Sequence, residues 1–135
     1  MDFDLNANPC IICSPDHPFG IHARFSHRDG TSLAKVTLGD AWQGFTGMVQ
    51  GGIITGLLDD AMWYASYGTH QVATVTAEIT VRFIHPVRID EPLEIKGQVV
   101  RYRSRLSDTS GELIQDGRLC AMATGRFMPM ADPAR

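Results

Sequence analysis

The most constraining feature of this sequence is one apolar segment of helical character, GGIITGLLDDAMWYASY. Its apolar side chains leave almost no polar face, which is typical of a helix that is buried inside a domain. We expect the helix to begin near Gly51 and to end near Tyr67, with Gly68 as its stop. Two adjacent carboxylates, Asp59 and Asp60, interrupt the apolar pattern. Because a buried carboxylate is costly, these two residues need a structural or chemical reason.

The segments on either side of this helix alternate with the period of two that is typical of strands. Before the helix, residues 21–38 alternate around Asp29-Gly30 and predict a hairpin. After it, three long strands are predicted, over residues 76–83, 93–106 and 112–128, with residues 107–111 as the turn between the last two. One buried helix and about five to six antiparallel strands predict an α+β domain whose sheet wraps around the helix.

The length of 135 residues predicts a single domain over 1–135, with an irregular lead-in at 1–20 and a tail at 131–135. A net charge of −3 disfavours nucleic acid as the main partner, because phosphate binding needs a basic excess. No apolar run approaches the roughly 20 residues that a membrane span needs. The N-terminal residues lack the apolar core of a signal peptide, so we expect a cytoplasmic protein.

Helix geometry assigns the two carboxylates to different environments, because adjacent helical residues point about 100° apart. Asp59 meets the small residues Thr55 and Gly56 one turn earlier, and we therefore expect it to face a cavity. Asp60 meets Leu57 and Tyr64, which favours a hydrogen-bonded or edge position. A purely structural role for both carboxylates is the alternative.

Gly51 and Gly52 admit a close backbone approach, and a helix N-terminus offers unpaired N–H groups with positive dipole character. That combination suits an oxyanion. Gly51 and Asp59 lie about 12 Å apart along one helix, too far to act on the same carbonyl. Two chains could achieve this if the glycine N–H of one helix and the carboxylate of its partner flank one reacting carbon.

The order of elements and the string VQGGIITGLLDDAM resemble the hotdog-fold acyl-CoA thioesterases of the PaaI-like branch. In that family a His-Gly-Gly opens the central helix, and a carboxylate follows nine residues after the histidine. NPCIICSPDHPFGI resembles the Cys-rich lead-in of some members, and VTAEITVRFIHPV resembles the strand that follows the helix. The resemblance covers most of the chain and implies a hotdog fold that acts on acyl-CoA without a cofactor.

Carried over by position, the resemblance implies Asp59 as the catalytic carboxylate, Gly51 as the oxyanion donor and Thr76 as an assisting hydroxyl. Gln50 stands where most members have histidine, and its amide can donate a hydrogen bond but cannot titrate near neutral pH.

A second difference from the family concerns the loop before the helix. Gly44 stands where some members have an Asn or Gln that helps to bind the thioester carbonyl, and Gln43 is the candidate to replace that amide. Gly52, beside the oxyanion donor, completes the expected substrate-binding end of the helix.

Cys10, Cys13, His17 and His22, in and just after the lead-in, are alternatively four candidate zinc ligands. The cysteine pair and the histidines lie closer together than in a zinc finger, so structural cysteines and no metal site are expected. Cys120 lies alone in a strand pattern, which indicates packing.

Basic residues on the predicted strands are candidates for the phosphates of CoA, with a solvated strand face as the alternative reading. They are Arg82, Lys96, Arg101, Arg103 and Arg105.

A dehydratase of this fold would need a histidine paired with the acidic residue, and none lies between residues 39 and 50. His85, before a proline, is expected to be a loop or surface residue.

Two functions therefore follow from the sequence. The first is hydrolysis of an acyl-CoA thioester by a homodimer or homotetramer, with Asp59 as general base or nucleophile and Gly51 stabilising the oxyanion. The second is a non-catalytic protein of the same fold that binds an acyl-CoA or an aromatic ligand.

Overall fold

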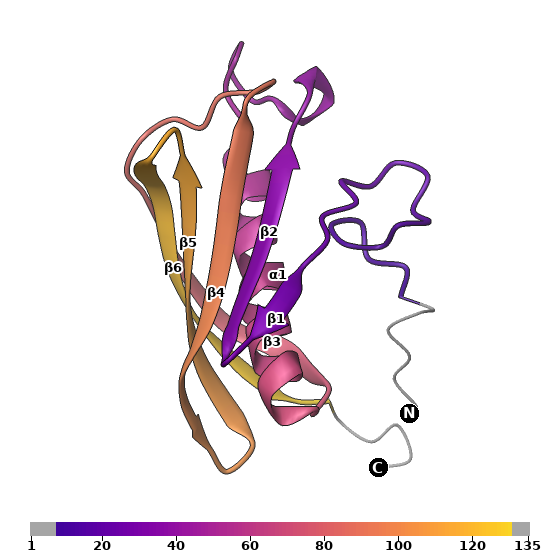
Figure 1. The fold of residues 1–135 in the computed structure, drawn as a ribbon, viewed down its shortest axis with the longest axis vertical. Helices are drawn as coiled ribbons and strands as arrows, with labels where there is room; N and C mark the ends of the chain where they lie inside the picture. The colour runs from indigo at the N-terminus through magenta and orange to yellow at the C-terminus, as the bar shows by residue number, and fades with distance from the viewer. Residues whose placement is uncertain (1–7, 131–135) are drawn as a thin grey trace.

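A computed structural model describes residues 8–130 of the chain and contains one long helix and six strands (Figure 1). The helix, α1, spans Gly51–His70, and a short 3-10 helix, η2, spans Asp40–Trp42. The strands are β1 (Ser26–Arg28), β2 (Thr31–Thr37), β3 (Thr74–Phe83), β4 (Pro92–Arg103), β5 (Leu106–Gln115) and β6 (Arg118–Pro129). The predicted tail and the first seven residues of the predicted lead-in lie outside the described residues.

The six strands form one sheet in the order β1-β2-β4-β5-β6-β3, and each neighbouring pair is antiparallel. The sheet curves along one side of α1 (Figure 1). The N-terminal segment lies on the side of the helix that the sheet leaves open (Figure 1). The predicted α+β architecture, a sheet wrapped around one long helix, is confirmed. Within the described residues, no helix is long and apolar enough to cross a membrane.

Helix α1 buries one stripe of side chains against the sheet rather than its whole surface. The stripe consists of Ile54, Leu57, Leu58, Ala61, Met62, Ala65 and Ser66. Its spacing of three and four residues is that of one helix face. The opposite face, which carries Asp59 and Asp60, is only partly covered. The predicted burial of the helix is complete only for this stripe, and the carboxylates occupy the less buried side.

The helix approaches the sheet most closely at Gly97 of β4. A Cβ atom at Gly97 would lie 2.1 Å from the backbone oxygen of Ala61, so only glycine fits between the strand and the helix. The hydroxyl of Ser32 on β2 donates a hydrogen bond to the same oxygen. This contact sets how deeply α1 lies in the curved sheet.

The helix ends later than predicted, because Gly68 is not its stop. Gly68 lies within α1, where a Cβ atom would lie 2.3 Å from the ring of His27. The glycine therefore gives the histidine of β1 room to pack. Gln71 ends the helix instead, with the left-handed φ of 57° that is typical of a C-terminal cap, and its N–H donates to Tyr67.

The hairpins of the second half also differ from the prediction. The turn between β4 and β5 lies at Ser104-Arg105, both at positive φ, and the predicted turn residues 107–111 belong to β5. The predicted single strand 112–128 is two strands, which are joined by Asp116-Gly117. Asp-Gly is a strong signal for a two-residue hairpin turn, so this break was visible in the sequence.

The predicted N-terminal hairpin is confirmed around Asp29-Gly30, although β1 is only three residues long. Residues 8–20, the described part of the lead-in, form turns without a strand or helix. Ile12 from this segment packs into the core, 8% exposed. The lead-in is therefore attached to the domain through an apolar anchor.

Candidate functional site

Asp59 and Thr76 are brought together across the space between α1 and β3. Asp59 lies in the middle of the helix, and Thr76 lies near the start of the strand that follows it. The Thr76 hydroxyl donates a hydrogen bond of 2.7 Å to Asp59 Oδ1. This contact holds one carboxylate oxygen in place and leaves the second oxygen for other chemistry.

Burial raises the pKa of the Asp59 carboxyl, and the hydrogen bond from Thr76 opposes part of that rise. The carboxylate lines a cavity of about 220 Å³ together with Asp60, Trp63 and Val75. A carboxylate that is partly desolvated and oriented by one donor is a competent proton acceptor.

Asp60 lines the same cavity but has different partners. The Cys10 thiol of the N-terminal segment donates to Asp60 Oδ2 at 3.4 Å. Burial chiefly raises the pKa of Asp60 to about 8, whereas a hydrogen bond from Cys13 chiefly lowers the pKa of Cys10 to about 5. The sequence predicts a hydrogen-bonded or edge position for Asp60, but its thiol partner Cys10 is fifty residues away in the chain and could not be foreseen.

The N-terminus of α1 opens on a second and larger cavity of about 610 Å³. Gly51 lines it beside the ring of Phe83, and Gln50 is the N-cap residue of the helix. Gln50 Oε1 accepts a hydrogen bond of 3.0 Å from the N–H of Ile53. A Cβ atom at Gly52 would lie 2.8 Å from that same oxygen, so glycine at this position makes room for the cap.

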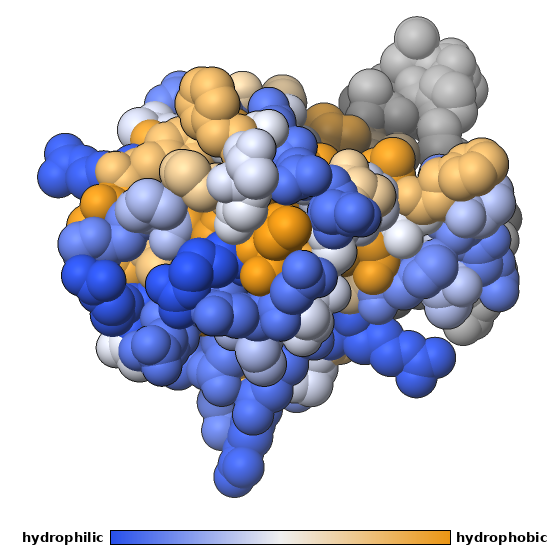
Figure 2. Space-filling view, turned by 90° about the horizontal axis from the view of Figure 1, so that it is seen from above, coloured by the Kyte–Doolittle hydropathy of each residue, from blue (hydrophilic) through white to orange (hydrophobic). Residues whose placement is uncertain are grey.

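The lining of this cavity is predominantly apolar, and most of it was missed from the sequence. It includes Phe45, Met48, Ile54, Phe83, Ile84 and His85. Phe45, Phe83 and Ile84 are exposed large hydrophobic residues. Figure 2 shows hydrophobic residues among hydrophilic ones at one end of the molecule. His85 lies in the loop after β3, as expected, and its place at the cavity follows only from the folded chain.

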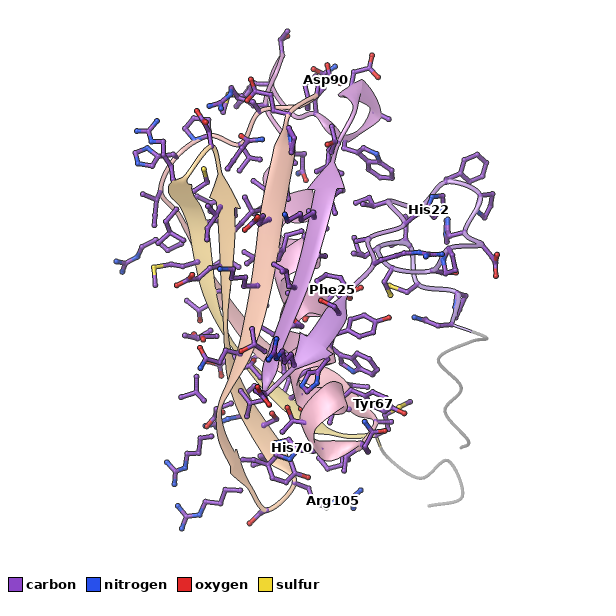
Figure 3. The ribbon with its side chains drawn as sticks, in the orientation of Figure 1. His22, Phe25, Tyr67, His70, Asp90 and Arg105 are labelled. Atoms are coloured by element: carbon purple, nitrogen blue, oxygen red, sulfur yellow. The ribbon has the colours of Figure 1, made fainter. Side chains whose placement is uncertain are left out.

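Four of the candidate residues, Gly52, Thr76, Gln43 and Arg82, lie outside the linings of both cavities, although Gly52 and Thr76 contact residues that line them. Gln43 Oε1 accepts a hydrogen bond from the Gly47 N–H, and Arg82 is exposed on β3. Among the candidate phosphate ligands, Arg105 lies in the β4–β5 turn, at the end of the molecule opposite Asp90 (Figure 3). Those arginines therefore do not form one continuous strand face.

The two cavities share no lining residue, so one chain separates the helix N-terminus from Asp59. Strand β3 connects them, because Val75 lines the smaller cavity and Phe83 lines the larger one. It is an edge strand of the sheet, paired only with β6 among the described residues. Nine of its ten residues are half-buried or exposed.

The family model of the thioesterase superfamily matches residues 46–121, which contain α1 and most of the sheet. The chain belongs to the thioesterase superfamily. This match covers Gly51, Asp59 and Thr76, and the resemblance to hotdog-fold thioesterases of the PaaI-like branch is confirmed. No curated protein matches the chain.

Solved structures of thioesterases share the fold. A thioesterase superfamily protein is 28% identical with a TM-score of 0.81, and the match covers 91% of this chain but only 63% of that protein. A putative thioesterase of Ralstonia eutropha, described as phenylacetic acid degradation-related, is 26% identical over 80% of this chain and 85% of its own, with a TM-score of 0.73. A hypothetical thioesterase of Streptococcus pneumoniae, solved with coenzyme A, is 18% identical over 82% and 87%, with a TM-score of 0.75.

Proposed function

We propose that this protein hydrolyses acyl-CoA thioesters to a free acid and coenzyme A, at sites that two copies of the chain share. The observation that carries the proposal is the Asp59 carboxylate, partly desolvated and held by Thr76 in a cavity beside an open edge strand. Membership of the thioesterase superfamily supports the reaction class.

Asp59 supplies the base or the nucleophile. As a base, its free oxygen takes a proton from water while the water oxygen attacks the thioester carbonyl carbon. The resulting oxyanion needs a donor that is already in place, and the Gly51 N–H at the start of α1 offers one together with the helix dipole. Collapse of the tetrahedral intermediate breaks the C–S bond, and the thiolate of coenzyme A leaves and takes up a proton.

Two copies of the chain are needed because Asp59 and Gly51 are in separate cavities. The open edge of β3 supplies a surface for a second copy, since an edge strand with unpaired backbone groups and exposed apolar side chains is a template for pairing. Antiparallel pairing of two β3 strands would bring the Phe83 end of one copy beside the Thr76 end of the other. Gly51 of one chain would then face Asp59 of its partner.

The larger cavity supports an acyl group as its occupant. Its lining is mostly apolar, and its volume of about 610 Å³ is within the range of small-molecule sites. Phe45, Met48 and Phe83 offer aromatic and polarisable contacts to an aromatic or short branched acyl group.

The test is steady-state hydrolysis of a panel of acyl-CoA substrates, with the released thiol detected. Asp59→Asn should lower kcat by about 100- to 10,000-fold, because the isosteric amide cannot accept the proton. Asp116→Asn, in a turn that lines neither cavity and at a backbone conformation that asparagine tolerates, is the matched control and should retain activity. Acyl-CoA binding without thiol release by the parent protein would instead identify a ligand-binding member of the fold.

A further inference from the structure

A second group of reactive side chains lies next to Asp59 and has no part in the proposed hydrolysis. It consists of Cys10, Cys13 and Asp60, whose sulfur and oxygen ligand atoms all lie within 4.8 Å of one another. All three side chains are at least half-buried, and all three line the smaller cavity. Two thiols and one carboxylate converge here from segments that are fifty residues apart.

The local structure holds the two thiols in fixed positions. The Ser14 N–H donates to the Cys10 carbonyl at 3.0 Å, which closes a turn with both cysteines on it. Backbone hydrogen bonds from Ile21 to Ile11 and from Ala23 to Ile12 attach this turn to the following segment. The ligand atoms are therefore placed by backbone contacts, as a preorganised site requires.

Contacts with the helix fix the same turn from the other side. Ile12 packs against Gly56 of α1, where an added Cβ would lie 3.1 Å from the isoleucine Cδ1. Asp60 lies one turn beyond Gly56 on that helix. The distance between the turn and Asp60 is therefore set by packing rather than by the thiol contacts alone.

The surroundings of Asp60 lack the positive charge that a buried carboxylate normally has. No basic side chain lies within salt-bridge distance of Asp60 in residues 8–130, and its hydrogen-bond partner is a thiol. Buried carboxylates are normally paired or coordinate a metal. A cation among these three groups would neutralise most of their charge.

The donor set and its spacing fit zinc. Thiolate ligands favour soft and borderline metals, and zinc accepts sulfur and carboxylate oxygen at about 2.3 and 2.0 Å in a tetrahedron. Those bond lengths place the sulfur and oxygen ligands about 3.5 Å apart. The observed separation of Cys10 Sγ and Asp60 Oδ2 is 3.4 Å.

We propose that Cys10, Cys13 and Asp60 bind one zinc ion and leave its fourth position open to the smaller cavity. The Asn8 side chain donates a hydrogen bond of 3.2 Å to Cys13 Sγ, which is how outer residues orient a thiolate ligand. The ion fastens the N-terminal segment to α1. His17 and His22 are not members of this group: the Phe19 N–H donates to His17 Nδ1, and the His22 ring contacts the His17 carbonyl out in the N-terminal segment (Figure 3).

The test measures metal directly. The purified full chain should contain about one zinc per chain by elemental analysis, and cobalt added to the apoprotein should give a thiolate-to-cobalt charge-transfer band. Cys10→Ser and Cys13→Ser should each weaken zinc binding and abolish or reduce that band. Cys120→Ser is the matched control, because Cys120 is buried in β6 and contacts the Arg118 carbonyl, and this variant should bind zinc as the parent does.

A second measurement keeps the proposal testable if a cysteine variant folds poorly. Added zinc should raise the thermal midpoint of the reduced apoprotein in a concentration-dependent way, and Asp60→Asn should diminish that rise. A reduced parent protein that takes up neither zinc nor cobalt overturns the proposal, as does equal uptake by a Cys10→Ser/Cys13→Ser double variant. Isolation of the chain with a Cys10–Cys13 disulfide and no zinc uptake after reduction would also overturn it. Because these readouts do not involve turnover, they are independent of the proposed hydrolysis.

Discussion

Asp59 and Asp60 are adjacent in the sequence, yet different partners hold them. Asp59 accepts a hydrogen bond from the hydroxyl of Thr76 on β3, whereas Asp60 contacts a thiol of the N-terminal segment. The helix places both on its less buried side, and its turn of 100° per residue directs them to different neighbours. One residue is thus suited to proton transfer and the other to ligation of a cation.

Gly51 is the position at which the oxyanion proposal can be tested with the smallest change. Proline at the first helical position removes only the N–H, and Gln50 already has the extended conformation, φ −65° and ψ 139°, that a residue before proline adopts. Loss of one oxyanion donor should lower kcat by about 100- to 1,000-fold in Gly51→Pro. Gly51→Ala keeps the N–H, and its Cβ would lie at an ordinary 3.6 Å from Phe83, so it should stay close to the parent. Equal activity of the two variants in steady-state assays would remove Gly51 from the mechanism.

We expect His70 to make the free energy of unfolding depend on pH. Its Nε2 is buried without a hydrogen-bond partner in the described residues, its ring stacks on Tyr102 at 3.6 Å, and burial lowers its pKa from the usual 6.5. The unfolded chain therefore takes up a proton at a higher pH than the folded chain does, so the free energy of unfolding should fall as the pH drops below about 6.5.

The matched variant for His70 is His70→Phe, which keeps a ring against Tyr102 and cannot titrate. Denaturant unfolding between pH 7.5 and 5, a range chosen to bracket the histidine value of about 6.5, should show a smaller decrease in stability for this variant. The same slope in both proteins would show that another group is responsible.

At the scale of elements, the position of α1 in the sheet depends on Gly97. Gly97→Ala would place a Cβ 2.1 Å from the Ala61 oxygen, and because both partners are backbone, the helix must move. The free energy of unfolding should fall by about 3 kcal/mol or more. Gly39→Ala is the control, since nothing lies within 4 Å of its Cβ position and its φ is −83°, and it should change stability by less than about 0.5 kcal/mol. Thermal or urea unfolding measures both.

The elements that the sequence predicts well are those with a strong local pattern. The central helix, the Asp29-Gly30 turn and the alternation of β3 and β4 each follow from residues that are close in the chain. The end of the helix was misplaced because Gly68 serves a tertiary contact with His27, which no local pattern reveals. The β4–β5 turn uses Ser104 and Arg105 at positive φ, where glycine or asparagine would be expected, and so gave no signal.

The candidate site also combines features that local spacing predicts with features that depend on distant segments of the chain. Spacing along one helix predicts that Asp59 and Gly51 are about 12 Å apart and that the two aspartates differ. The partners of those aspartates, Thr76 and Cys10, come from other segments, and only the resemblance to a family indicated Thr76. The apolar cavity at the helix N-terminus is assembled from two separate stretches, residues 44–54 and 83–87, so its lining could not be read from either one alone.

At the scale of the whole molecule, the proposed second copy of the chain would account both for the open edge of β3 and for the separation of the two cavities. The edge strand is ten residues long and carries exposed Val75 and Phe83, which a soluble monomer would ordinarily protect. Light scattering should therefore show at least a dimer. Pairing at this edge would also complete each site, because it is β3 that runs from Asp59 to the mouth of the larger cavity.

If two chains share each site, the activities of two kinds of mixed dimer should differ in a way that a single-chain site cannot reproduce. In the first mixed dimer, purified through two different tags, one chain carries Asp59→Asn and the other carries Gly51→Pro. If the sites are shared, one site then has both substitutions and the other site is intact. This dimer should keep about half of the parent activity. The control places both substitutions on one chain and pairs it with a parent chain. Every shared site then has one lesion, and that dimer should be almost inactive. If each chain formed its own site, the two outcomes would be exchanged, because the first dimer would have no intact chain and the second would have one. Thiol release from a single acyl-CoA substrate by the two purified dimers therefore decides whether Gly51 and Asp59 act across the interface.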